Sequence, residues 1–99
     1  MNIIISAKVQ AKLSAKNPPV QLREIHECFT NRTRTYLLDK REDHQSDPPT
    51  RWFIAETHYG RKLKIAFILR DGSLTIRSAY TPCEAELTVY ASHSSPLDE

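Results

Sequence analysis

The pair Asp71-Gly72 stands between two apolar runs and constrains the fold more than any other feature of this 99-residue sequence. Both central residues of a two-residue type I′ turn need positive φ angles, and Asp-Gly is among the pairs that adopt them most readily. The pair therefore predicts a tight hairpin between a strand over 63–69 and a strand that begins at Ser73. Because the turn fixes which residues face each other, it also fixes the face to which each side chain belongs.

The register of this hairpin places most apolar side chains on one face. It pairs Leu69 with Leu74, Phe67 with Ile76, Ile65 with Ser78 and Leu63 with Tyr80. The other face carries three cations on adjacent strands, namely Lys62, Lys64 and Arg77. Since neighbouring cations can hold a nucleic-acid phosphate backbone, we expect a phosphate-binding surface on this face of the sheet.

The strand over 50–57 enters the same sheet through the loop His58-Tyr59-Gly60. A three-residue loop, with its glycine at the bulge position, places Glu56 opposite Lys62 and puts Trp52 on the cationic face. The resulting surface could bind RNA through phosphate contacts and through base stacking on the indole.

A four-residue loop is the alternative, and it would place Phe53 and Ala55 on that face instead. We favour the three-residue loop because it pairs opposite charges across the strands. Even then, a strand face with ordinary charge pairs explains the pattern as well as an RNA surface does.

Two helices are expected before the sheet. Apolar residues recur every four positions from Ile5 to Leu13, which predicts a helix that Asn17-Pro18-Pro19 ends. A second helix should run over 20–30, followed by a weak strand over 34–38.

The last helix is expected after a capping box, Thr81-Pro82-Cys83-Glu84, with proline at the first helical position. The polar tail over 92–99 is expected to fray. Residues 1–99 are therefore predicted to form one α+β domain with two N-terminal helices, a four-stranded antiparallel meander and a C-terminal helix. The helices would cover one face of the sheet and leave the other open to solvent or to a partner.

The run DKREDHQSDPP over 39–49 gathers many ionisable groups. His44 lies among carboxylates, so it could titrate near neutrality and act as an acid or a base. Acids beside a double proline are equally typical of a solvated turn. Asp39 and Asp43 could form a metal pair, but no further ligand spacing supports one, and we expect no metal and no cofactor. A small hydrolase that uses the acidic loop over 39–47 is an alternative function.

Composition and length narrow the classes of protein further. A net charge of +2 permits a polyanionic partner without requiring one. Cys28 and Cys83 form no CxxC motif, and we expect both thiols to be free. The sequence has no signal peptide and no run of about 20 apolar residues that could span a membrane, so the cytoplasm is the expected compartment. The core is modest, which is compatible with a homodimer.

The motifs of the second half follow a characteristic order. A strand leads to a turn ending at Gly60-Arg61, a second strand to a turn at Gly72, and Ile76-Arg77-Ser78-Ala79 follows. A helix with Glu86 and Tyr90 four residues apart completes the order. This part of the chain resembles the BrnT toxins of bacterial type II toxin–antitoxin systems, members of the RelE/ParE-like superfamily. The two front helices agree with that family in order.

The segment D-x-R-E-D-H-x-x-D-P-P is also similar to small bacterial proteins, some of which are labelled ADP-ribosyl-(dinitrogen reductase) hydrolases. Enzymes that resemble that name are large, all-helical and magnesium-dependent, and this chain is too short for their fold.

The BrnT resemblance implies a metal-independent endoribonuclease that is neutralised by a ribbon-helix-helix antitoxin. It implies RNA cleavage through attack of the 2′-hydroxyl on the adjacent phosphate. The expected catalytic residues are His44, Glu56 and Arg77. The expected substrate-binding residues are Trp52, Arg61, Lys62, Lys64 and Tyr80. Where such toxins carry arginines after Ser-Ala and in the last helix, this chain has Tyr80, Glu84 and Glu86. A catalytically inactive BrnT-like module that regulates a partner protein is the other alternative.

Overall fold

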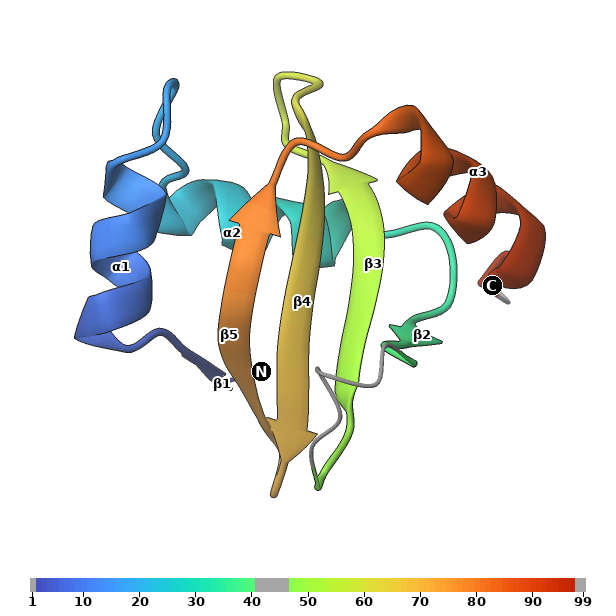
Figure 1. The fold of residues 1–99 in the computed structure, drawn as a ribbon, viewed down its shortest axis with the longest axis horizontal. Coiled ribbons are helices and arrows are strands. Elements are labelled where there is room, and N and C mark those ends of the chain that lie inside the picture. The colour runs from blue at the N-terminus through green and yellow to red at the C-terminus, as the bar shows by residue number, and fades with distance from the viewer. Residues whose placement is uncertain (1, 41–46, 98–99) are drawn as a thin grey trace.

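A computed structural model describes residues 2–40 and 47–97, which form a five-stranded mixed sheet with helices on both sides (Figure 1). The elements along the chain are β1 (Asn2–Ile4), α1 (Ala7–Ser14), α2 (Leu22–Asn31), β2 (Leu37–Leu38), β3 (Thr50–Glu56), β4 (Lys62–Arg70), β5 (Ser73–Tyr80) and α3 (Glu84–His93). The strand order across the sheet is β1-β5-β4-β3-β2. The predicted α+β class is therefore confirmed.

The sheet contains a strand that the sequence did not predict. β1 runs parallel to β5 and pairs Asn2 with Ser73, whose side chains are joined by a hydrogen bond of 3.1 Å. Part of the N-terminal isoleucine run therefore extends the sheet instead of starting a helix. α1 begins at Ala7, where the Ser6 hydroxyl accepts a hydrogen bond from the backbone N–H of Val9 at 3.2 Å.

The Asp71-Gly72 turn has the positive φ angles that the sequence predicted, 51° and 79°. Near the turn, the pairing is also as predicted: Arg70 with Ser73, Leu69 with Leu74, and Phe67 with Ile76. The local turn chemistry is therefore sufficient to set the first part of the hairpin.

Beyond Ile76 the predicted register is wrong, because Arg77 is an extra residue that forms a β-bulge. The bulge moves Ala79 to the core face, where it is fully buried, and pairs Tyr80 with Lys64. Tyr80 therefore leaves the face on which it was expected. The physical reason is that the small Ala79 fits the core, while the phenol finds polar partners on the other side.

The loop between β3 and β4 has the three-residue form. Glu56 pairs with Lys62 across the strands, and the Thr57 N–H donates to the Arg61 carbonyl at 2.9 Å. Gly60 has a φ of 84°, which a residue with a Cβ rarely adopts. The favoured register of β3 is therefore confirmed.

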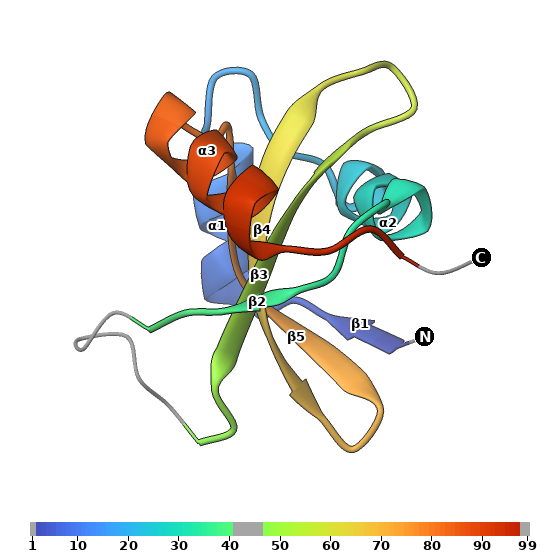
Figure 2. The ribbon, with the colours of Figure 1, turned by 90° about the vertical axis from the view of Figure 1, so that its right-hand side faces the viewer.

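Helices cover both faces of the sheet. α2 packs against the face that carries Phe53 and Phe67, and its Ile25 and Cys28 are fully buried there. Figure 2 shows α2 on one side of the sheet, with α1 and α3 on the other. The prediction that one face lies open is therefore wrong.

α3 starts two residues later than predicted. Cys83, rather than Thr81, is the N-cap residue, and its backbone N–H donates to the Glu86 Oε1 at 3.0 Å. The capping box is present, but it uses the second glutamate of the helix. This shift decides where the other carboxylate oxygen of Glu86 lies.

The segment after α3 pairs with the chain before β2, where fraying was expected. The Thr35 N–H donates to the Ser95 carbonyl at 2.8 Å, and the Leu97 N–H donates to the Thr33 carbonyl at 3.0 Å. Arg34 adds a bond of 2.7 Å from its Nε to the Ser94 hydroxyl. These bonds fix the C-terminal end of α3.

Candidate functional site

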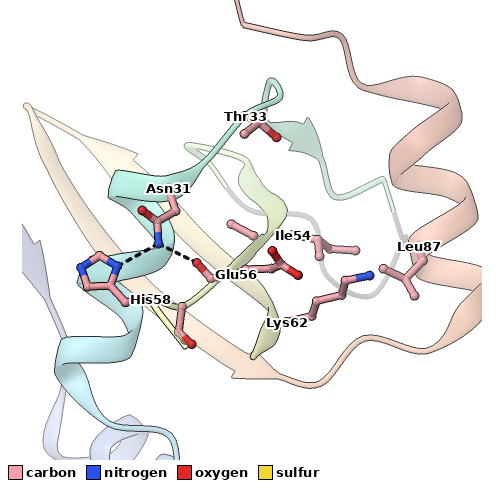
Figure 3. A pocket seen from close by; sticks show the side chains of 9 residues that line it. Asn31, Thr33, Ile54, Glu56, His58, Lys62 and Leu87 are labelled. Atoms are coloured by element: carbon pink, nitrogen blue, oxygen red, sulfur yellow. Dashed lines mark hydrogen bonds between the residues drawn. The ribbon is translucent and has the colours of Figure 1, made fainter. Parts of the chain in front are cut away.

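An open pocket of about 770 Å³ lies where β3 ends and β4 begins, between the last turn of α2 and α3 (Figure 3). Its lining residues are Asn31, Thr33, Ile54, Ala55, Glu56, Thr57, His58, Lys62 and Leu87. Figure 3 shows Asn31 and His58 on one side, Glu56 near the middle, and Lys62 and Leu87 on the other side. A carboxylate, an imidazole and an ammonium group therefore share one solvent-accessible hollow.

Glu56 and Lys62 enter this pocket because the three-residue loop sets them opposite each other. Both side chains are exposed. Within the described ranges, 2–40 and 47–97, neither residue forms an ion pair. Their charges are therefore available to a ligand. The sequence predicted both as site residues, and the structure brings them together.

His58 is the imidazole of the pocket, and α2 fixes its position. The Asn31 amide donates to the Glu56 carbonyl and to the His58 Nδ1, each at 3.0 Å. Since a carbonyl oxygen can only accept, the NH₂ side of this amide faces both groups. The His58 Nδ1 is therefore an acceptor, and its Nε2 carries the proton and can donate to a ligand.

The backbone of His58 is held as well. Its N–H donates to the Glu27 Oε1 at 2.9 Å. This backbone hydrogen bond holds the pKa of Glu27 below its usual value, although burial of the carboxyl opposes it. Sequence reasoning identified the loop at His58 as a turn but missed its role, because its partners Asn31 and Glu27 belong to a distant helix.

Arg61 was expected to bind substrate, but its guanidinium is engaged within the protein. Nη1 donates to the Pro19 carbonyl at 2.8 Å and to the Glu24 Oε1 at 3.1 Å. Nη2 donates to the Pro18 carbonyl at 2.9 Å. Arg61 therefore holds the β3–β4 loop against the turn between α1 and α2.

Lys64 lies on the predicted face, but α3 covers it, and only 6% of the residue is exposed. Its Nζ donates to the Glu86 Oε2 at 2.7 Å and to the Tyr80 hydroxyl at 3.1 Å. The Tyr80 hydroxyl also donates to the Glu86 Oε2 at 2.6 Å. The expectation of an exposed phosphate-binding Lys64 is therefore wrong, because Glu86 already neutralises it.

Trp52 is buried in the same place and is not a surface indole. Only 8% of the residue is exposed. The Lys64 Nζ lies 4.6 Å from the centre of its ring, and the Tyr90 ring lies 5.6 Å from it. Trp52 therefore attaches α3 to the sheet instead of presenting a stacking surface.

The charge states of the buried cluster are those of a stable ion pair. Burial favours neutral Lys64, but its hydrogen bonds to Glu86 and Tyr80 outweigh burial and hold the pKa of the lysine above its usual value. Burial and the bond to Glu86 raise the pKa of Tyr80. Near neutral pH the cluster is an ammonium, a phenol and a carboxylate, and none of them is poised to exchange a proton.

Arg77 is exposed at the bulge of β5, whereas Lys64 is buried beneath α3, so the three cations do not form one exposed cluster. The three cations that were predicted to share one surface occupy three different locations: Lys62 at the pocket, Lys64 beneath α3, and Arg77 at the bulge. The predicted cluster of three cations is wrong because the bulge and α3 were not foreseen.

The acidic loop lies mostly beyond the described residues. The prediction for His44, and with it the hydrolase alternative that uses 39–47, falls in the undescribed range 41–46. Among the residues that are described, Asp39 is buried, and no three His, Cys, Asp or Glu side chains come together as a possible metal site.

Comparisons with protein-family models, curated proteins and solved structures found no match for this chain. Within 2–40 and 47–97, no helix has the length and apolar character needed to cross a bilayer. Both cysteines are free, as predicted, with Cys28 buried and Cys83 exposed.

Proposed function

We propose that this protein is a metal-independent endoribonuclease and that the pocket of Glu56, His58 and Lys62 is its active site. The observation that carries the proposal is that these three side chains, a base, a hydrogen-bond donor and a cation, line one open pocket. Cleavage of RNA by its own 2′-hydroxyl needs those groups and no metal.

The reaction follows from the chemistry of the three groups. The Glu56 carboxylate takes the proton of the 2′-hydroxyl as the O2′–P bond forms. The Lys62 ammonium stabilises the charge on the phosphorane and donates a proton to the 5′-oxygen as the P–O5′ bond breaks. The products are a 2′,3′-cyclic phosphate and a 5′-hydroxyl. Proton exchange with water restores the carboxylate and the ammonium.

His58 has a separate task in this scheme. Its Nδ1 accepts from Asn31, so its Nε2–H can donate to a non-bridging phosphate oxygen. In this scheme His58 orients the phosphate through that N–H.

The BrnT resemblance supports the biological side of the proposal. The protein would be the toxin of a type II toxin–antitoxin system, acting in the cytoplasm on RNA and neutralised by a ribbon-helix-helix antitoxin. Two helices, the antiparallel strands β2–β5 and a final helix follow each other in the order expected of a RelE/BrnT-like layout, and the parallel strand β1 is an addition to that layout.

The test is cleavage of a defined RNA by the purified protein in EDTA, with the products analysed by mass spectrometry. The proposal expects 2′,3′-cyclic phosphate ends and 5′-hydroxyl ends. Cleavage that EDTA abolishes, or products with 3′-hydroxyl ends, would contradict it.

A second candidate function is a catalytically inactive binding module of the same architecture. The observation in its favour is the neutralised Lys64, which removes one cation from the surface that RNA was expected to meet. Induced expression in bacteria separates the two candidates. A ribonuclease toxin arrests growth, whereas the module leaves growth unchanged and is recovered with a protein partner.

A further inference from the structure

Tyr59 is the most exposed large apolar or aromatic residue in the described part of the chain, with 88% of its surface accessible. It occupies the loop between β3 and β4, directly after His58 of the pocket. Within 2–40 and 47–97, its ring contacts no other aromatic ring and no cation. An aromatic ring with this exposure contributes little to the fold and is available to a ligand.

The loop that carries Tyr59 is held firmly on both sides. The Gly60 N–H donates to the Thr57 carbonyl at 3.0 Å, which closes the turn around the tyrosine. Before the tyrosine, the His58 N–H is bonded to Glu27. After it, Arg61 is bonded to the 18–19 turn and to α2. A ring on a fixed loop loses little conformational entropy when it binds, which favours its use in recognition.

The other aromatic candidate for stacking, Trp52, is only 8% exposed. Trp52 was expected to stack on bases, but it lies beneath α3 with Lys64 and Tyr90 against its ring. In the chain, Tyr59 stands between two residues that line the pocket: His58 directly precedes it, and the exposed Lys62 follows three residues later. An exposed aromatic ring beside groups that bind phosphate is the arrangement by which proteins bind single-stranded nucleic acid.

We propose that Tyr59 stacks on a nucleobase of single-stranded RNA, next to the phosphodiester that Lys62 and His58 hold. This inference rests on the proposed function and names its substrate class. Bases in a duplex are already stacked on each other and cannot receive the ring, so Tyr59 selects unpaired RNA. A peptide partner is the alternative occupant that the experiment must exclude.

The test uses the full chain and a fluorescent 12-nucleotide single-stranded RNA in which fluorine replaces every 2′-hydroxyl. This RNA keeps its bases and phosphates but cannot be cleaved, so anisotropy measures binding alone. Tyr59→Ala should weaken binding about 5- to 100-fold, and Tyr59→Phe should retain it, since the ring and not the hydroxyl stacks. Leu69→Ala is the matched control, because Leu69 is 40% exposed at the far end of β4, and it should bind normally.

A set of oligonucleotides with one abasic position each locates the stacked base. One abasic position should weaken binding of the natural chain and cause no further loss in Tyr59→Ala, which would show that the two changes remove the same contact. Equal binding by Tyr59→Ala and the natural chain would overturn the stacking role, and so would equal affinity for duplex RNA.

These outcomes are separate from the test of the active site. Cleavage in EDTA by both the natural chain and Tyr59→Ala, with unchanged affinity, would leave the ribonuclease intact and remove the stacking role. Binding that depends on Tyr59, without any cleavage, would support stacking and remove the catalytic proposal. Failure of the natural chain to bind RNA at all would overturn both, and so would binding of Tyr59 to a protein partner only.

Discussion

The Nζ of Lys64 lies 2.7 Å from the Oε2 of Glu86, and this contact joins the middle of the sheet to the first turn of α3. The same carboxylate caps the helix through its other oxygen. α3 in turn supplies Leu87 to the pocket of Glu56 and His58. The buried ion pair is therefore a structural support for one wall of the candidate active site.

Glu86→Gln should destabilise the protein, because it removes the negative partner of a lysine whose side chain is only 8% exposed. A hydrogen bond to a charged group contributes about 1.5–3 kcal/mol, so we expect a loss of about 2 kcal/mol. Urea denaturation measures it. Glu84→Gln, on the exposed side of the same turn, is the control and should change stability by less than about 0.5 kcal/mol. Equal midpoints for the two variants would contradict this role.

The same carboxylate predicts loss of stability in acid. Burial raises the pKa of Glu86, but hydrogen bonds from Lys64, Tyr80 and Cys83 lower it by more than burial raises it. The net effect takes the pKa from 4.5 to about 2. The unfolded chain therefore binds a proton at a higher pH than the folded chain. The stabilisation is present above pH 4.5 and is lost as the pH falls through 2. Urea midpoints of the natural chain and Glu86→Gln should converge between pH 5 and pH 2. A constant difference would argue against the pair.

The two thiols should differ sharply in reactivity. Burial, followed by the charges of Glu24 and Glu27, raises the pKa of Cys28 to about 12. Cys83 is exposed. At pH 8, iodoacetamide should add one group to the folded chain and none to Cys83→Ser. Intact-protein mass spectrometry reads both results, and rapid labelling of folded Cys83→Ser would show that the packing around Cys28 is incorrect.

Arg61→Lys should reduce stability, because lysine cannot make the forked bonds to Glu24, Pro18 and Pro19. We expect a loss of about 1–3 kcal/mol in urea denaturation. Arg23→Lys is the control, since the side chain of Arg23 is 55% exposed and its pair with Glu27 contributes little. If Arg61→Lys keeps its stability but no longer binds RNA, Arg61 binds substrate, as the sequence suggested.

The parts of the fold that the sequence predicted best are governed by local chemistry. The Asp71-Gly72 pair and the Gly60 bulge position each require a positive φ, and each set its turn as expected. The parts that it missed depend on contacts between distant segments. β1 pairs with a strand about 70 residues further on, and the Arg77 bulge shifts the register by one residue without changing the apolar pattern enough to be recognised.

In the site, as in the fold, local features could be predicted and contacts between distant segments could not. Glu56 and Lys62 could be paired from loop length and opposite charge alone. The position of α3 over Lys64 could not be predicted, because it depends on which glutamate caps the helix and on the packing of Tyr90 against Trp52. The position of His58, two residues after Glu56 at the end of a strand, could have marked it as a site residue in the sequence. Its orientation could not be predicted, because Asn31 of a distant helix sets it.

The most direct measurement of the central claim is the rate of RNA cleavage in EDTA by the natural chain and by two pocket variants, Glu56→Gln and Lys62→Ala. Each variant should lose at least about 100-fold in rate, the usual contribution of a proton-transfer group. The matched controls, Glu84→Gln and Lys12→Ala, change exposed charges outside the pocket and should cleave normally. If the pocket variants cleave as fast as the controls, or if the natural chain does not cleave RNA, the pocket is not a ribonuclease site.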